Sequence, residues 1–164
     1  MKIFLDTADV DLIGKYYETG LIDGVTTNPT LIKKSGRDPE QVYKELAIIG
    51  VDDISMEIVT DDYFEFLQEG RRLHEKFGDI TTIKVPCTPQ GLRGCKLLSD
   101  EDIRVNVTLI FSAAQAVLAS KAGAAYVSPF VGRVDDNSFD GLRLIEEIAD
   151  IYEKQSRLYN FVDT

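Results

Sequence analysis

Six short apolar stretches of the sequence carry polar side chains near their C-terminal ends. Asp6, Glu57 and Lys84 stand among these polar residues. A lysine amine attacks a carbonyl only when it is uncharged, which apolar neighbours favour, and a nearby carboxylate can move the protons of such a reaction. These three residue types therefore have the chemistry of a nucleophile with acid–base partners, provided that the fold brings them together.

The six stretches are typical of β-strands that alternate with helices. Strands are expected at residues 2–6, 24–28, 54–59, 81–86, 104–110 and 125–130. Helices are expected at about 8–18, 39–49, 62–77, 89–98, 111–122 and 138–154, with N-caps at Asp6 or Thr7, Asp61, Thr88 and Ser112. This alternation predicts βαβ units and a parallel sheet in one α/β domain, residues 1–164.

In all six predicted strands, the residues that point to one face are apolar and those that point to the other face are polar near the C-terminal end. Strands of an α/β fold are normally apolar on both faces, and side chains alternate between the faces. One parity is apolar and is expected to pack against helices: Ile3, Leu5, Val25, Met56, Ile58, Ile83, Val85, Val105, Val107, Leu109 and Val127. The other parity is polar, and buried polar groups are costly unless they are satisfied. Convergence at the C-terminal mouth of a parallel barrel, where barrel enzymes place their sites, explains the whole polar set.

Each polar residue taken singly also has a structural interpretation. These are a helix cap at Asp6, an ion pair of Glu57 with Lys84, a turn at Asn28, satisfied polar groups at Asn106 and Thr108, and a surface pair of Arg133 with Asp135 or Asp136. Taken together, six strands that obey one rule favour a common site.

Composition narrows the classes of partner. The net charge of −10 disfavours nucleic acid and anionic membranes, although a local basic pocket for one sugar phosphate is compatible with it. No apolar run approaches the roughly 20 residues of a membrane span. Cys87, Cys95 and the single histidine, His74, form neither a disulfide framework nor a typical transition-metal site. We therefore expect no metal, and a soluble protein of a reducing compartment such as the cytoplasm.

Five segments together resemble the small transaldolases, a family of class I aldolases. The segments are FLDTA at 4–8, GVTTNPT at 24–30, IKVP at 83–86, NVTLIFS at 106–112 and SPFVGR at 128–133. The resemblance covers the whole chain. It implies a TIM-type (β/α)8 barrel and cofactor-free Schiff-base chemistry on sugar phosphates of the pentose phosphate pathway.

The resemblance also implies roles for individual residues. Lys84 resembles the Schiff-base lysine, and Asp6 the acid–base group at the hydroxyl next to the broken bond. Glu57 with Thr108 resembles the pair that manages the catalytic water. The implied substrate-binding residues are Thr26, Asn28, Asn106, Ser128, Phe130 and Arg133, with Arg133 at the phosphate. A dihydroxyacetone unit would remain on Lys84 until an aldehyde acceptor takes it.

Fructose-6-phosphate aldolases share this fold and this lysine and are the alternative within the family. They typically carry glutamine where this chain has Glu57 and tyrosine where it has Phe130. Both differences favour a transferase over a simple aldolase.

The chain is expected to hold an incomplete barrel. A barrel of this type has eight strands, and the sequence predicts six, ending at 159–164 where a seventh should begin. The family's seventh strand brings a serine and a second basic residue to the phosphate. Three interpretations follow: a C-terminally truncated transaldolase, a shortened protein completed by strand pairing, or a non-catalytic interaction protein. The open first and sixth strands, with Phe4 and Tyr126 on their inner faces, are expected to be covered by another copy of the chain or by a rearranged terminal segment around residues 158–162. Of the two, a homo-oligomer is the expected form.

Overall fold

The computed structural model describes residues 2–162, and the side chains of residues 2–154. Strands and helices alternate along this range. The strands are β1 (Phe4–Asp6), β2 (Gly24–Thr26), β3 (Ile54–Glu57), β4 (Thr81–Pro86), β5 (Arg104–Ile110) and β6 (Tyr126–Pro129). The helices are α1 (Val10–Tyr17), α2 (Pro29–Ser35), α3 (Pro39–Ile49), α4 (Tyr63–Phe77), α5 (Pro89–Ser99), α6 (Ala113–Lys121), α7 (Val131–Asp136) and α8 (Gly141–Val162), with a short 3-10 turn, η1 (Gly78–Ile80).

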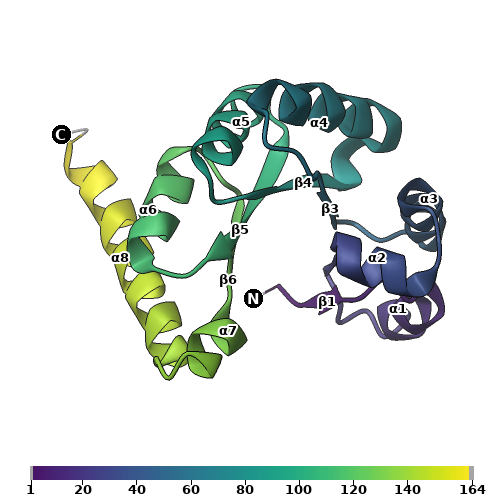
Figure 1. Ribbon diagram of the computed structural model, residues 1–164, viewed down its shortest axis with the longest axis horizontal. Helices are drawn as coiled ribbons and strands as arrows, with labels where there is room; N and C mark the ends of the chain where they lie inside the picture. The colour runs from purple at the N-terminus through teal and green to yellow at the C-terminus, as the bar shows by residue number, and fades with distance from the viewer. Residues whose placement is uncertain (1, 163–164) are drawn as a thin grey trace.

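The strands form one parallel sheet in the order β1-β2-β3-β4-β5-β6. Figure 1 shows this sheet curled like part of a barrel, with the helices on its outer side. The prediction of a TIM-type barrel with only about six βα units is therefore confirmed. Because the strands are parallel, their C-terminal ends meet at one edge, where barrel sites form.

The apolar parity of the strands builds the core between sheet and helices. Val25, Met56 and Ile83 are 0% exposed, as the pattern predicts. Neighbouring helices approach closely where glycines face apolar side chains, since a Cβ on Gly70 of α4 would lie 2.9 Å from Leu98 of α5. This layer fixes the strands and so fixes the directions of the side chains on the inner face.

Two apolar positions depart from the parity rule. Leu109 has a left-handed φ of 61° and is 39% exposed, whereas Ile110 is fully buried. The register between β5 and β6 is irregular from Val107 to Ile110, so one residue is inserted and the faces exchange after Thr108. The expectation that Leu109 packs against helices is wrong for this reason. Ile3 is also 44% exposed, because it precedes β1 rather than lying within the sheet.

The caps were predicted in part. Thr88 and Ser112 cap α5 and α6 as expected. The first helix begins later than predicted, because Asp9 rather than Asp6 or Thr7 accepts from the backbone of α1. Asp62 takes the place expected for Asp61 at α4. Displacement of the cap to Asp9 leaves the Asp6 carboxylate available at the end of β1.

The edge strands β1 and β6 approach each other through their side chains. The rings of Phe4 and Tyr126 meet edge to face, with centroids 5.5 Å apart. The Tyr126 hydroxyl accepts from Lys2 Nζ at 3.1 Å. The curl of the sheet thus brings these two aromatic side chains into contact within one chain, which the expectation of cover by another copy or by the terminal segment did not foresee. Oligomerisation itself stays a prediction.

Helix α8 occupies the place where a seventh strand was expected to begin. It runs to Val162 and packs beside α6 and α7 (Figure 1). The predicted strand start is therefore wrong up to residue 162, and residues 163–164 lie outside the described range. The proposal that side chains of residues 158–162 cover the open edges falls outside the described side chains.

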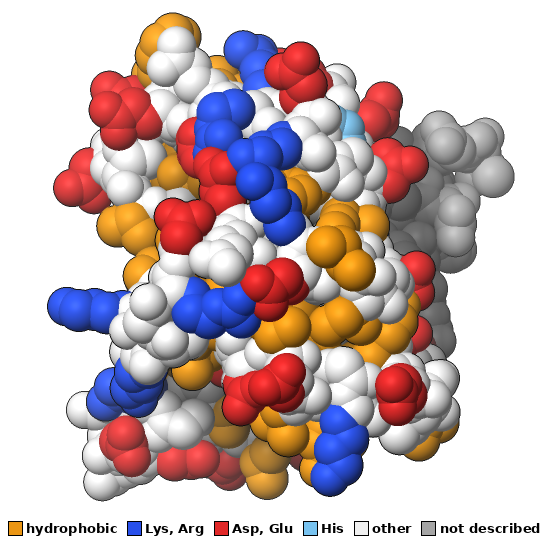
Figure 2. Space-filling view, turned by 90° about the vertical axis from the view of Figure 1, so that its right-hand side faces the viewer, with side chains coloured by type: hydrophobic (Ala, Val, Ile, Leu, Met, Phe, Trp, Pro, Cys, Tyr) orange, Lys and Arg blue, Asp and Glu red, His pale blue; other side chains and the backbone are white. Residues whose placement is uncertain are grey.

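The side of the molecule formed by α1–α4 carries a mixed surface. Figure 2 shows acidic and basic side chains interspersed on it, with hydrophobic side chains between them. Within residues 2–162, none of the helices has the length and apolar character needed to cross a membrane.

Candidate active site

Most of the predicted site residues line one cavity of about 590 Å³ at the C-terminal ends of the strands. Eight of the ten are among its walls: Asp6, Thr26, Asn28, Lys84, Thr108, Ser128, Phe130 and Arg133. Glu57 and Asn106 lie outside its lining but bond to members of the set. The structure therefore brings all ten residues together, as the common parity of the strands predicts for every one of them except Arg133, which lies beyond the strands.

Lys84 lies at the centre of this group. It projects inward from β4 and is 6% exposed. Its Nζ lies 3.0 Å from Glu57 Oε2 and donates to the backbone oxygen of Thr27 at 3.2 Å. Glu57 ends β3 directly beside Lys84, because the two residues are register partners. The amine is thus held by one carboxylate and one carbonyl and is open to the cavity.

Thr27 is a site residue that the sequence pattern missed. It has the opposite parity to Thr26, and it contributes a backbone atom, which a side-chain pattern does not reveal. Its own amide and hydroxyl both donate to the oxygen of Ser55, at 3.2 and 2.9 Å. Burial raises the pKa of the neighbouring Tyr43, whose hydroxyl is bonded with Thr27. This packing fixes the carbonyl that Lys84 contacts.

The two residues at the ends of β1 and β2 are directly bonded. Thr26 Oγ1 donates to Asp6 Oδ1 at 2.9 Å, so the carboxylate has a fixed orientation at the cavity wall. Asn28 serves two purposes, because it caps α2 through a 2.9 Å bond from Leu31 and also lines the cavity. Asn28 is therefore a helix cap rather than the turn residue of the structural interpretation, and this role is compatible with its place in the site.

A buried chain of hydrogen bonds supports the other wall. Ser128 donates to Asn106 Oδ1 at 2.9 Å, and Asn106 donates to Ser55 Oγ at 3.3 Å. Asn106 is thus a satisfied polar group. Thr108 differs, because its side-chain oxygen is buried and has no hydrogen-bond partner within the described part of the chain. An unpaired buried hydroxyl is costly, so one in a cavity wall is suited to bind a molecule there.

The outer rim of the cavity comes from α7. Phe130 directly precedes this helix and stacks edge to face on Phe111 at 5.4 Å. Arg133 lies one turn on, with its side chain 73% exposed and 3.9 Å from Asp136. So weak and exposed a pair leaves the guanidinium free to take another anion. The sequence predicted Arg133 but not the short helix that carries it.

The sequence of the chain matches a known family. The family model for transaldolase/fructose-6-phosphate aldolase covers residues 3–164. The chain belongs to this family. A probable transaldolase of Nitrosopumilus maritimus (strain SCM1) is 49% identical over 158 residues, which is 96% of this chain and 71% of that protein. A probable transaldolase of Clostridium kluyveri is 52% identical over 156 residues, which is 95% of this chain and 72% of that protein.

Solved structures reproduce the fold at low sequence identity. The carboxyl transferase domain of Rhizobium etli pyruvate carboxylase with pyruvate superimposes with a TM-score of 0.52 at 14% identity. The match covers 93% of this chain and 34% of that one. At this identity the likeness concerns the arrangement of strands and helices alone.

Proposed function

We propose that the chain acts through a Schiff base on Lys84 and transfers a dihydroxyacetone unit between sugar phosphates, as a transaldolase. One observation carries this proposal. The buried Nζ of Lys84 lies between the Glu57 carboxylate and the Thr27 carbonyl. Lys84 also lines a cavity, and a second carboxylate, that of Asp6, lines the same cavity. A nucleophilic amine with two carboxylates is the set of groups that this reaction needs.

The first part of the reaction forms the covalent link. The neutral amine of Lys84 adds to the ketose carbonyl, and the resulting carbinolamine loses its hydroxyl as water to give an iminium. Glu57 is placed to take and return the protons of these steps, since its oxygen lies 3.0 Å from the reacting nitrogen. Thr108, whose side-chain oxygen has no hydrogen-bond partner among the described residues, offers its hydroxyl to that water from the lining of the same cavity as Lys84.

The second part breaks the carbon–carbon bond. Asp6 takes the proton of the hydroxyl next to that bond, the carbonyl of the aldehyde forms, and the bonding electrons move into the iminium. The dihydroxyacetone unit stays on Lys84 as an enamine until it attacks an acceptor aldehyde. Arg133 at the rim provides a positive charge for a phosphate at the far end of the sugar.

The experiment is reductive trapping. Treatment with borohydride and fructose 6-phosphate is expected to add a mass that peptide mass spectrometry assigns to the peptide containing Lys84. Lys84→Ala should abolish the adduct. Lys96→Ala is the matched control, because Lys96 is an exposed lysine on α5 paired with Asp100, and it should leave the adduct unchanged. An adduct that survives Lys84→Ala contradicts the proposed site. Absence of any adduct with the unmodified chain supports the non-catalytic interpretation.

A further inference from the structure

Two cavities meet at the contact between Lys84 and Glu57. Lys84 lines the substrate cavity described above, whereas Glu57 lines a second cavity of about 550 Å³ between α3 and α4. We call this second space the α3–α4 cavity; it is bounded by Asp38, Pro39, Glu40, Tyr43, Glu57, Ile58, Val59, Thr60, Glu65, Gln68, Glu69, Arg72 and Leu73. The side chain of Glu57 is 21% exposed and that of Lys84 8%. The ion pair thus forms the partition between the cavities.

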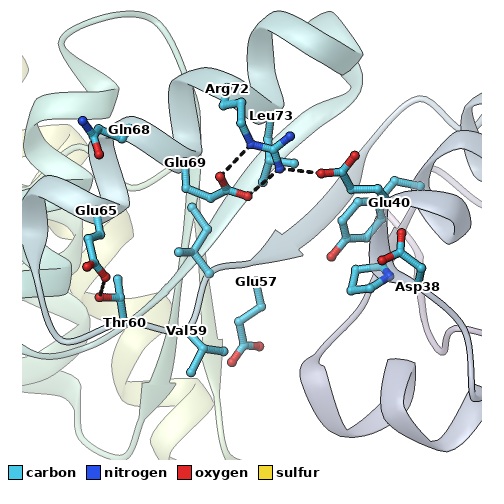
Figure 3. A pocket seen from close by; sticks show the side chains of 13 residues that line it. Asp38, Glu40, Glu57, Val59, Thr60, Glu65, Gln68, Glu69, Arg72 and Leu73 are labelled. Carbon is cyan, nitrogen blue, oxygen red and sulfur yellow. Dashed lines mark hydrogen bonds and ion pairs between the residues drawn. The ribbon is translucent and has the colours of Figure 1, made fainter.

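The geometry of the strand ends explains why Glu57 reaches a different cavity from its partner. The ladder between β2 and β3 ends at Thr26 and Ser55. Glu57 therefore lies past the end of the β2–β3 ladder and pairs only with Lys84 of β4, so it has no ladder partner on its β2 side. Figure 3 shows its carboxylate in the space between the α3 residues and those of α4.

The proposed reaction handles a water molecule at this carboxylate. Schiff-base formation releases one water from the carbinolamine, and release of the product ketone consumes one. A sugar phosphate attached to Lys84 would occupy the substrate cavity, because Lys84 lines it. Glu57 is still reached from the α3–α4 cavity. We propose that this cavity is the route by which water and protons exchange with Glu57 while substrate occupies the other cavity, an inference that rests on the proposed function.

The step balances without any further reactant. A water from the α3–α4 cavity attacks the iminium carbon and gives a proton to Glu57 as the carbon–oxygen bond forms. The electron pair of the carbon–nitrogen double bond moves to the Lys84 nitrogen. The carbinolamine then collapses, its hydroxyl proton passes to nitrogen, and the carbon–nitrogen bond breaks to leave a ketone and a free amine. The reverse sequence delivers water to the same cavity.

The walls of the α3–α4 cavity suit water and protons and exclude the substrate. Asp38, Glu40, Glu65 and Glu69 face one basic residue, Arg72, among the lining. Arg72 bonds to Glu40 at 2.6 Å and to Glu69 at 2.7 Å, so its charge is engaged. Carboxylates repel the like charge of a phosphate group, and the repulsion grows where the walls of a cavity displace water. The acidic lining therefore keeps sugar phosphates out and leaves the route to water.

Isotope exchange tests the route. The chain turns over fructose 6-phosphate in water enriched in heavy oxygen, and mass spectrometry measures the carbonyl oxygen of the ketose per turnover. Gln68→Trp and Thr60→Phe place bulk in the α3–α4 cavity. Glu75→Trp is the matched control. Glu75 is exposed on α4, the helix that also carries Gln68, but it does not line the α3–α4 cavity. Incorporation of solvent oxygen measured with the Lys84→Ala variant gives the spontaneous background, which is subtracted from the value for each other variant.

The blocked variants should retain borohydride trapping at Lys84 and lose solvent-oxygen incorporation severalfold per turnover, because the released water stays beside the iminium and returns. The Glu75→Trp variant should exchange as the unmodified chain does. Undiminished incorporation in both blocked variants, with trapping intact, overturns the route and leaves the proposed function standing. Failure of the unmodified chain to form the adduct overturns both.

Discussion

Lys84 Nζ and Glu57 Oε2 lie 3.0 Å apart, on residues that are register partners in β4 and β3. The contact places the carboxylate directly against the amine, within reach of a proton transfer between them. A structural ion pair and a catalytic pair share this geometry. They differ in what happens when the charge of Glu57 is removed and its shape is kept.

Glu57→Gln together with Phe130→Tyr should shift the chain from transfer towards simple donor cleavage. The amide cannot take a proton from water, and the hydroxyl added by Phe130→Tyr would give the cavity a new proton donor. The measurement is the rate of fructose 6-phosphate consumption with and without an aldehyde acceptor. The unmodified chain should be accelerated strongly by acceptor and the double variant far less. If the unmodified chain runs equally fast without acceptor, the assignment moves to the aldolase branch.

Thr108→Val should stabilise the fold and lower activity. The change removes a buried hydroxyl that has no partner within the described residues, whose unpaired state costs about 1–3 kcal/mol. We expect a rise of about 1 kcal/mol in the free energy of unfolding by urea titration, with a reduced rate of transfer. Thr82→Val is the matched control. Thr82 is equally buried but donates to Asp53 at 2.7 Å, so its loss should destabilise. Destabilisation by Thr108→Val would show that its hydroxyl is structural.

The parity of the strands predicted the barrel and the site, because burial and alternation are local properties of each strand. It failed where backbone geometry intervened. The left-handed residue Leu109 inverts the faces after Thr108. Thr27 contributes a carbonyl, and backbone atoms leave no trace in a pattern of side chains.

Short helices and the choice of N-cap residue were the other features that the sequence pattern did not predict. Helix α2 begins at Pro29, directly after Asn28, where the second strand was expected to end. Helix α7 likewise begins at Val131, directly after Phe130, the expected end of the sixth strand. Neither is long enough to show an apolar period of its own. Asp6, Thr7 and Asp9 are all good N-caps, so composition could not tell which one ends the loop. The α3–α4 cavity depends on the spacing of two helices and has no sequence signature.

Asp53 should be critical for folding and dispensable for the chemistry of Lys84. It is 1% exposed at the N-terminal end of β3, opposite the site. It accepts from Thr82 and Arg104 at 2.7 Å and from Tyr126 at 2.8 Å, which ties β4, β5 and β6 together. Asp53→Asn should lower the free energy of unfolding by about 2–3 kcal/mol, since hydrogen bonds to a charged group are lost.

The neighbouring Asp52→Asn is the control for that experiment. Asp52 is exposed and accepts from Tyr17 at 2.8 Å, so its replacement should cost less than about 1 kcal/mol. The folded Asp53→Asn protein should still be trapped at Lys84. Equal stability of the two variants would mean that the polar cluster does not hold the curled sheet together.

Glu40 should make the contact between α3 and α4 sensitive to acid. Hydrogen bonds from Lys76 and Arg72 hold the pKa of the Glu40 carboxyl below its ordinary value of 4.5. A carboxyl whose pKa is lower in the folded state adds stability above the unfolded value and loses it as the pH falls through the folded one. These are largely exposed pairs, so Glu40→Gln should cost roughly 0.5–1 kcal/mol at neutral pH.

The difference between the unmodified chain and Glu40→Gln should shrink as the pH falls from 4.5 through the lower pKa of the folded state, below which the wild-type carboxyl is also neutral. Urea unfolding across that range measures it. Glu75→Gln on α4 provides the baseline for loss of an exposed charge, and its effect should vary little over the same range. A cost for Glu40→Gln that persists undiminished in acid would mean that the residue acts through packing. The bridge from Glu40 to Arg72 and Lys76 would then not be the electrostatic link between the walls of the α3–α4 cavity.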